Sequence, residues 1–149
     1  MSRGVVISLR PTLQDIPRIA EAVEDFFSRN GLPDKPRLHL TLALDELATN
    51  ALTYGYPGGA VGENAVVIRL RLEGDVVVAL LEDGGVPFDP FTVQPPDTTL
   101  GIDERRIGGL GLHFVRELMD EISYERDGSI NRLTLRKRLS GSGPAQTDG

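Results

Sequence analysis

Apolar side chains recur along this chain with two periods, which predict its helices and its strands. A helical period of three to four residues runs through Ile16–Phe27, Leu40–Ala51 and Leu110–Leu118. Residues 67–72 instead alternate between apolar and polar, as in a half-buried strand. The run Val76–Leu81 is almost continuously apolar, which is typical of a central strand covered on both faces.

Further strands are expected at Gly4–Leu9, where Val and Ile are frequent, and in a last hairpin at Glu121–Arg126 and Asn131–Arg138. Thr12 or Asp15 can cap the first helix, and Pro17, which is tolerated only in a first helical turn, favours Asp15. We expect Asp34 to cap the second helix, with Pro36 in its first turn.

The stretch Val86–Ile107 has no regular period, so we expect a long loop there, and long loops in compact domains are usually functional. Arg132, Arg136, Lys137 and Arg138 make the last strand basic, and we interpret them as charges that protect a sheet edge or its end.

This order of elements predicts an α/β two-layer sandwich, in which a mixed, mostly antiparallel sheet carries its helices on one face. We expect a single domain at residues 1–139 and a disordered polar tail at residues 140–149.

Charge and composition exclude several classes of function. The net charge of -6 would repel a nucleic-acid backbone. No apolar run approaches the ~20 residues that span a bilayer, and the first residues do not resemble a signal peptide, so we expect a cytoplasmic protein. The absence of cysteine excludes disulfides and thiolate metal sites.

Three short segments carry the candidate chemistry of an ATP site. Glu46 and Asn50 stand four residues apart, so both lie on one helical face, where they can reach a metal-bound phosphate. Asp83 ends an apolar strand, before two glycines, and can accept a hydrogen bond from adenine. The run Gly108–Leu112 opens a helix, whose free N–H groups favour an anion such as phosphate.

Taken singly, each segment also has an ordinary explanation. Glu46 alone would be a solvated carboxylate, Asp83 with its glycines a common hairpin turn, and the later glycines a tight packing turn. Arg105 and Arg106 can neutralise phosphate charge or simply be solvated. The fixed order of all three segments within one domain favours the nucleotide site.

Order and spacing of these segments resemble the N box and two glycine boxes of the GHKL superfamily of ATPases, which includes gyrase, heat-shock chaperones, histidine kinases and MutL. Within it, Leu44–Ala51 with Tyr54–Tyr56, and Gly109–Leu112 with Met119–Ile122, resemble the stand-alone anti-sigma-factor serine kinases. This resemblance implies the Bergerat ATP-binding fold, with ATP and Mg²⁺ as cofactors.

The resemblance also implies roles for individual residues. It assigns Mg²⁺ to Asn50, the general base to Glu46 and adenine recognition to Asp83, which Gly85 follows. The remaining nucleotide contacts are expected from Arg105, Arg106, Gly109, Leu110, Gly111 and Leu112. Asn131 stands where this family often has a threonine near adenine, so its role stays open.

The function expected from the resemblance is an ATP-binding anti-sigma factor with serine/threonine-protein kinase activity. It would phosphorylate an anti-sigma factor antagonist of the STAS type, bind a sigma factor and form a homodimer. The alternative is a non-catalytic switch, which binds a partner according to whether ATP or ADP is present. Retention of Glu46 favours the kinase.

Overall fold

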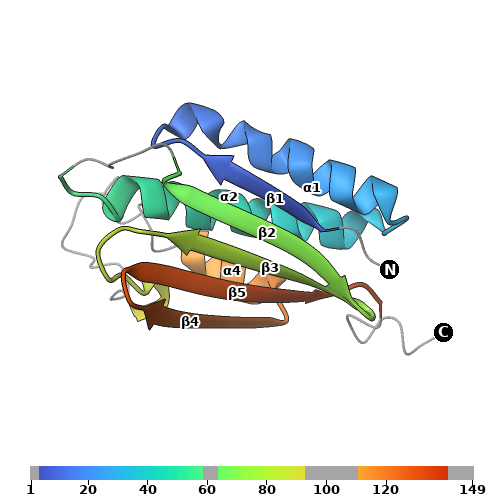
Figure 1. Ribbon diagram of the computed structural model, residues 1–149. Helices are drawn as coiled ribbons and strands as arrows, with labels where there is room; N and C mark the ends of the chain where they lie inside the picture. Colours follow the sequence, from blue (N-terminus) through green and yellow to red (C-terminus); the bar gives the residue numbers. More distant parts are fainter. Residues whose placement is uncertain (1–3, 59–63, 93–110, 141–149) are drawn as a thin grey trace.

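One antiparallel sheet and the helices on one of its faces form two layers in the computed structural model, which describes residues 4–58, 64–92 and 111–140 (Figure 1). The strands are β1 (Val5–Leu9), β2 (Val66–Glu73), β3 (Val76–Asp83), β4 (Glu121–Asp127) and β5 (Ile130–Arg138). The helices are α1 (Pro17–Arg29), α2 (Asp34–Tyr54) and α4 (Gly111–Leu118). The predicted fold class, a two-layer α/β sandwich, is confirmed.

The strand order is β1-β2-β3-β5-β4, and each pairing among the described strands is antiparallel. The central position of β3 explains its apolar run. Val77, Ala79 and Leu81 point toward the helices, and Val78 is fully buried on the opposite face of the sheet. Val76, Leu80 and Glu82 on that opposite face are only partly buried, so the prediction that this strand is covered on both faces is confirmed in part.

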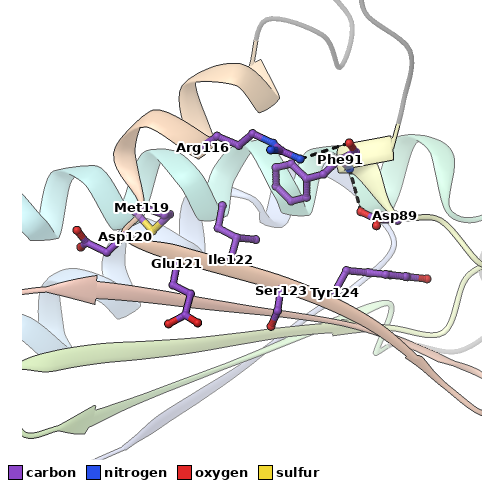
Figure 2. A pocket seen from close by; sticks show the side chains of 9 residues that line it. All are labelled: Asp89, Phe91, Arg116, Met119, Asp120, Glu121, Ile122, Ser123 and Tyr124. Atoms are coloured by element: carbon purple, nitrogen blue, oxygen red, sulfur yellow. Dashed lines mark hydrogen bonds between the residues drawn. The ribbon is translucent and has the colours of Figure 1, made fainter.

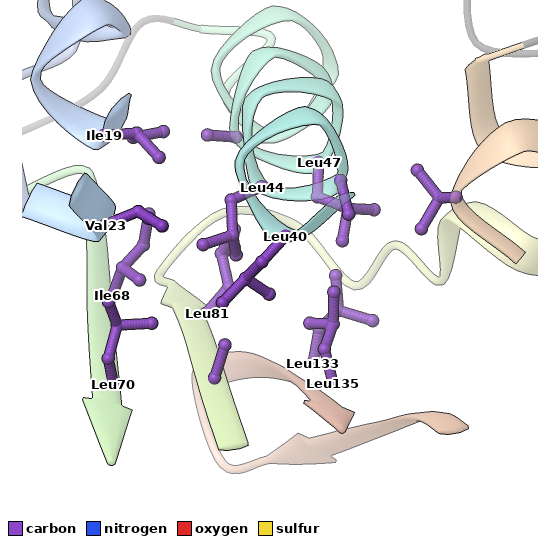
Figure 3. Packing of buried hydrophobic residues seen from close by; sticks show 14 of the residues in the cluster. Ile19, Val23, Leu40, Leu44, Leu47, Ile68, Leu70, Leu81, Leu133 and Leu135 are labelled. Carbon is purple, nitrogen blue, oxygen red and sulfur yellow. The ribbon is translucent and has the colours of Figure 1, made fainter. Parts of the chain in front are cut away.

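The core lies between the inner face of the sheet and α2 (Figure 3). Leu40, Leu44 and Leu47 follow one stripe of this helix and are at most 1% exposed. They pack on leucine and isoleucine side chains of β2, β3 and β5, while Ile19 and Val23 of α1 close one side. Removing so many large apolar side chains from water is the main force that holds the helices to the sheet.

The two predicted helix caps are wrong. Asp15 ends a short 3-10 helix at Leu13–Asp15, which Thr12 caps, and its carboxylate binds the guanidinium of Arg10 at 2.8 Å. Asp34 is the first residue of α2 and Pro33 occupies the cap position without a side-chain hydrogen bond. Asp15 cannot act as a cap because its carboxylate is held in the ion pair with Arg10. Asp34 does not act as a cap because the helix begins one residue earlier than expected.

The basic residues of β5 do not protect a sheet edge, because β5 lies between β3 and β4. Arg132 bridges Glu82 of β3 and Glu125 of β4 on the face opposite the helices. Lys137 points to the helical side, is only 6% exposed and donates to the Leu118 carbonyl at 2.6 Å. That contact ties the end of α4 to the sheet.

None of the helices in the described ranges is long and apolar enough to cross a membrane. Of the expected long loop, residues 86–92 are described and include a 3-10 helix at Pro90–Thr92. Residues 93–107 and the predicted disordered stretch from 141 onward lie outside the described residues.

Candidate nucleotide-binding site

The C-terminal half of α2 carries the predicted metal ligand and base. Asn50 is 4% exposed, and its amide nitrogen is buried without a hydrogen-bond partner among the described residues. An unpaired buried amide costs about 1–3 kcal/mol, so such groups are rare unless a ligand or water completes them. The orphaned amide of Asn50 therefore fits a residue that binds something the protein chain does not supply.

Glu46 lies one helical turn before Asn50 and is partly buried. It lines a groove of about 300 Å³ between α2 and α4, together with Leu42, Phe114, Val115 and Leu118. Among the described residues of this lining, Glu46 alone is ionisable and the other four are apolar, so Glu46 borders a largely apolar space. A base in such a place is accessible to a substrate while few other polar groups compete for it.

Asp83 ends β3 beside the C-terminal end of α2. One of its oxygens, Oδ1, accepts hydrogen bonds from Asn131 Nδ2 at 3.0 Å and from the Gly85 N–H at 2.9 Å. Burial raises the pKa of Asp83, while these two donors and the positive charge of Arg126 oppose the rise. Oδ2 has no hydrogen bond among the described residues, so it remains available to accept from a ligand.

Asn131 makes hydrogen bonds to four groups, one of which is the Asp83 carboxylate, a role that the sequence left open. It is 3% exposed and its Nδ2 donates to Asp83 and to the Val86 carbonyl at 2.8 Å. Its Oδ1 accepts from the Tyr124 hydroxyl at 2.5 Å and from the Phe88 N–H at 3.2 Å. Asn131 thus orients the Asp83 carboxylate and the start of the following loop.

The sequence does contain a signal for this role. Asn131 occupies an inward-facing position of β5, in phase with Leu133 and Leu135, which belong to the core. A polar side chain in the buried phase of a strand needs hydrogen-bond partners, and the register sets Asn131 directly opposite Asp83.

Gly85 brings the loop after β3 against the end of α2. A Cβ atom at this position would lie 2.3 Å from the carbonyl oxygen of Gly55, and the Val86 N–H donates to the same oxygen at 2.8 Å. Tyr56 adds a second link, because its hydroxyl accepts from the Gly84 N–H at 2.9 Å. Gly85 was predicted to contact the nucleotide. The structure shows a different requirement for glycine at this position, which is the close approach of two backbone segments.

The second glycine segment is described only in part. Arg105, Arg106, Gly109 and Leu110 lie outside the described residues, and Gly111 begins α4. Leu112 is 6% exposed and belongs to the hydrophobic core, so only its backbone could contact a phosphate. The N–H groups in the first turn of α4 have no acceptor within the helix, and a phosphate could bind them.

The described residues contain no group of three or more His, Asp or Glu side chains that could hold a metal ion. A Mg²⁺ ion near Asn50 would therefore take most of its ligands from phosphate and water, which is how Mg²⁺ is commonly bound in ATP sites. The residues present fit this arrangement, because Asn50 carries a side-chain carbonyl oxygen, Oδ1, that could bind the ion, while its unpartnered Nδ2 could donate to a phosphate oxygen.

A separate cavity of about 340 Å³ lies between α4, β4 and the loop after β3 (Figure 2). Arg116 of α4 stacks over the Phe91 ring with its guanidinium carbon 4.9 Å from the ring centre, and it donates to the Phe91 carbonyl at 3.4 Å. The Phe91 N–H in turn donates to Asp89 at 2.9 Å. None of the predicted site residues that the structure describes lines this cavity.

Comparison with known proteins agrees with this geometry. The family model described as histidine kinase-like ATPase domain matches residues 9–137. The serine/threonine-protein kinase BtrW of Bordetella bronchiseptica is 31% identical over 99 residues, a match that covers 66% of this chain and 68% of BtrW. The serine-protein kinase RsbW of Bacillus pumilus is 30% identical over 95 residues, covering 61% of this chain and 59% of RsbW.

Among solved structures, the RsbU and RsbW domains of Rv1364c from Mycobacterium tuberculosis superpose with a TM-score of 0.67 at 19% identity, covering 93% of this chain and 33% of the other. At that identity the superposition shows the fold alone. Fold, site geometry and family model agree, and the family implies ATP binding. The chain belongs to the histidine kinase-like ATPase domain family.

Proposed function

We propose that this protein is an ATP-dependent protein serine/threonine kinase that phosphorylates an anti-sigma factor antagonist of the STAS type. The observation that carries the proposal is the pair on α2, where Glu46 faces an open groove and Asn50 has an unpartnered buried amide one turn away. Relatives that are named serine-protein kinases support the same activity.

Each residue has a role in the proposed mechanism. Asp83 Oδ2 accepts from the adenine amino group, and the first turn of α4 donates N–H groups to phosphate oxygens. Asn50 Oδ1 would hold Mg²⁺, which when bound would neutralise part of the phosphate charge of ATP. Arg105 and Arg106, which lie outside the described residues, are expected to contribute positive charge to phosphate binding.

Glu46 accepts the proton of the serine or threonine hydroxyl while that oxygen bonds to the γ-phosphorus. The bond between this phosphorus and the bridging oxygen of ADP breaks in the same step, so that ADP leaves with the bonding electrons. Because the groove around Glu46 is mostly apolar, few water molecules compete with the hydroxyl as nucleophile.

The test is the Glu46→Gln variant, which keeps the size of the side chain and loses its ability to accept the proton. Transfer of radiolabelled phosphate to the antagonist should fall about 10²- to 10⁴-fold, while ATP binding stays at the wild-type level. Undiminished transfer by the variant would remove Glu46 from the base role. Nucleotide-dependent binding of the antagonist without transfer, even by wild type, would identify the non-catalytic switch instead.

The proposal extends to two further assemblies that the resemblance implies, a complex with a sigma factor and a homodimer. Light scattering after size exclusion, with ATP or ADP and with each candidate sigma factor, measures both. A monomer that binds no sigma factor in either nucleotide state would contradict this extension while leaving the kinase proposal intact.

A further inference from the structure

Large apolar side chains gather on one exposed surface of α2 and α4. Leu38 and Leu42 of α2 are 51% and 49% exposed, and Phe114 of α4 is 62% exposed. Leu38 and Leu42 are one helical turn apart and so share a face of α2. Single exposed apolar residues are ordinary, whereas a group of them beside a groove indicates a binding surface.

The groove between the two helices connects this surface to the proposed base. Leu42 and Phe114 form its exposed sides, and Val115, which is 1% exposed, belongs to the core beneath. Glu46 lies in the same lining, one turn after Leu42 on the same helix. A chain segment that lies in this groove therefore brings its own polar groups within reach of the Glu46 carboxylate.

Polar residues stand at the border of the apolar surface. His113 and Glu117 of α4 are 67% and 65% exposed, and His113 Nε2 lies 3.9 Å from a Glu117 carboxylate oxygen. An apolar centre with polar, solvated residues around it is the usual organisation of a protein–protein interface.

We propose that this groove binds the segment of the protein substrate that carries the acceptor hydroxyl, and that a large apolar side chain of that segment packs between Leu42 and Phe114. This inference rests on the proposed kinase function. A general base must come within about 2.6–3.2 Å of the hydroxyl whose proton it accepts, so the acceptor segment has to enter the groove. The apolar sides then select substrates that have a leucine, methionine or phenylalanine close to the acceptor serine or threonine.

The double variant Leu42→Ser with Phe114→Ser tests the groove. The probes are the STAS-type antagonist domains of the source organism, purified one by one and assayed with radiolabelled ATP. For the domain that accepts phosphate, KM should rise about 10- to 100-fold in the variant. The affinity for ATP should stay near the wild-type value, because neither side chain is proposed to contact the nucleotide and both substitutions leave the backbone N–H groups in place.

The matched control is Val6→Ser with Leu13→Ser, since these two residues are 57% and 55% exposed and lie outside the groove. A KM that is unchanged in the groove variant, or raised equally in the control, would overturn the inference. If wild type phosphorylates none of the antagonist domains, the kinase proposal is overturned instead. In that case, a domain that binds without being phosphorylated would be titrated against the groove variant and the control variant. Binding that is weaker only for the groove variant would support the docking site.

Photo-crosslinking from a benzoylphenylalanine at position 42 identifies the occupant directly. A crosslink to the antagonist, within a few residues of its acceptor hydroxyl, is the expected result. A crosslink to a second copy of this chain, or to another segment of the same chain, in the presence of the antagonist would show a different occupant and overturn the inference.

Discussion

Substitution of Gly85 by alanine tests the contact that joins the end of β3 to the end of α2. The new Cβ would lie 2.3 Å from the Gly55 carbonyl oxygen and 2.8 Å from its carbon, closer than real Cβ contacts come. Both contacting atoms belong to the backbone of Gly55, so no side-chain rotation relieves the overlap. The two segments must separate, which also strains the hydrogen bond from the Val86 N–H to the same oxygen.

The expected magnitude follows from these two effects. Overpacking costs about 1–3 kcal/mol, and a weakened backbone hydrogen bond adds about 0.5–1.5 kcal/mol. The free energy of unfolding should therefore fall by about 2–4 kcal/mol. At roughly 2–4 °C per kcal/mol for a chain of this size, the melting temperature falls by about 4–16 °C. ATP affinity should fall as well, since the Gly85 N–H helps to orient Asp83.

Gly84→Ala is the matched control, because a Cβ there has its nearest neighbours at 3.9 Å and neither glycine has a positive φ. Both variants gain the same small stabilisation from a less flexible unfolded chain, so their difference isolates the contact with Gly55. Calorimetry gives the melting temperatures and a nucleotide titration gives the affinities. Equal melting temperatures would refute the reasoning, and an affinity loss without a stability loss would show instead that Gly85 touches the nucleotide itself.

Three further predictions concern single polar side chains. Asp83→Asn should weaken ATP binding about 10- to 100-fold, and in a competition titration the variant should no longer prefer ATP over GTP. If wild type binds ATP and GTP with equal affinity, Asp83 does not recognise adenine. Burial raises the pKa of Asp83, so this carboxylate becomes protonated at a higher pH than an ordinary aspartate does. As the pH is lowered, the affinity of wild type for ATP should therefore begin to fall above the usual pKa of aspartate. Asn50→Ala should weaken Mg²⁺-dependent ATP binding without lowering the melting temperature, since its amide nitrogen has no partner to lose among the described residues; wild-type binding by the variant would remove Asn50 from the site.

Arg10 lowers the pKa of Asp15, so this ion pair stabilises the folded state above the unfolded aspartate pKa of about 3.9 and the stabilisation is lost as pH falls further. Acid unfolding of Asp15→Asn should therefore depend less steeply on pH below that value, and an identical slope would contradict this assignment.

The sequence by itself determined the features that depend on neighbours along the chain. The period of apolar residues gave the positions of α2 and β3, because a helix and a buried strand impose different spacings on the residues that face the core. The pairing of Glu46 with Asn50 on one face follows in the same way, since a spacing of four residues is fixed by the pitch of the helix.

Only the tertiary structure decided what depends on contacts between distant segments. The insertion of β5 between β3 and β4 turned the expected edge strand into an interior one and set Asn131 opposite Asp83, a partner 48 positions away in the chain. Asp15 formed an ion pair instead of a cap because Arg10, which directly follows β1, lies beside it. The groove beside Glu46 likewise exists only because α4 packs next to α2 and leaves Leu42 and Phe114 uncovered. Strand order and helix packing depend on how much apolar surface the whole chain buries, and a local pattern of residues does not contain that information.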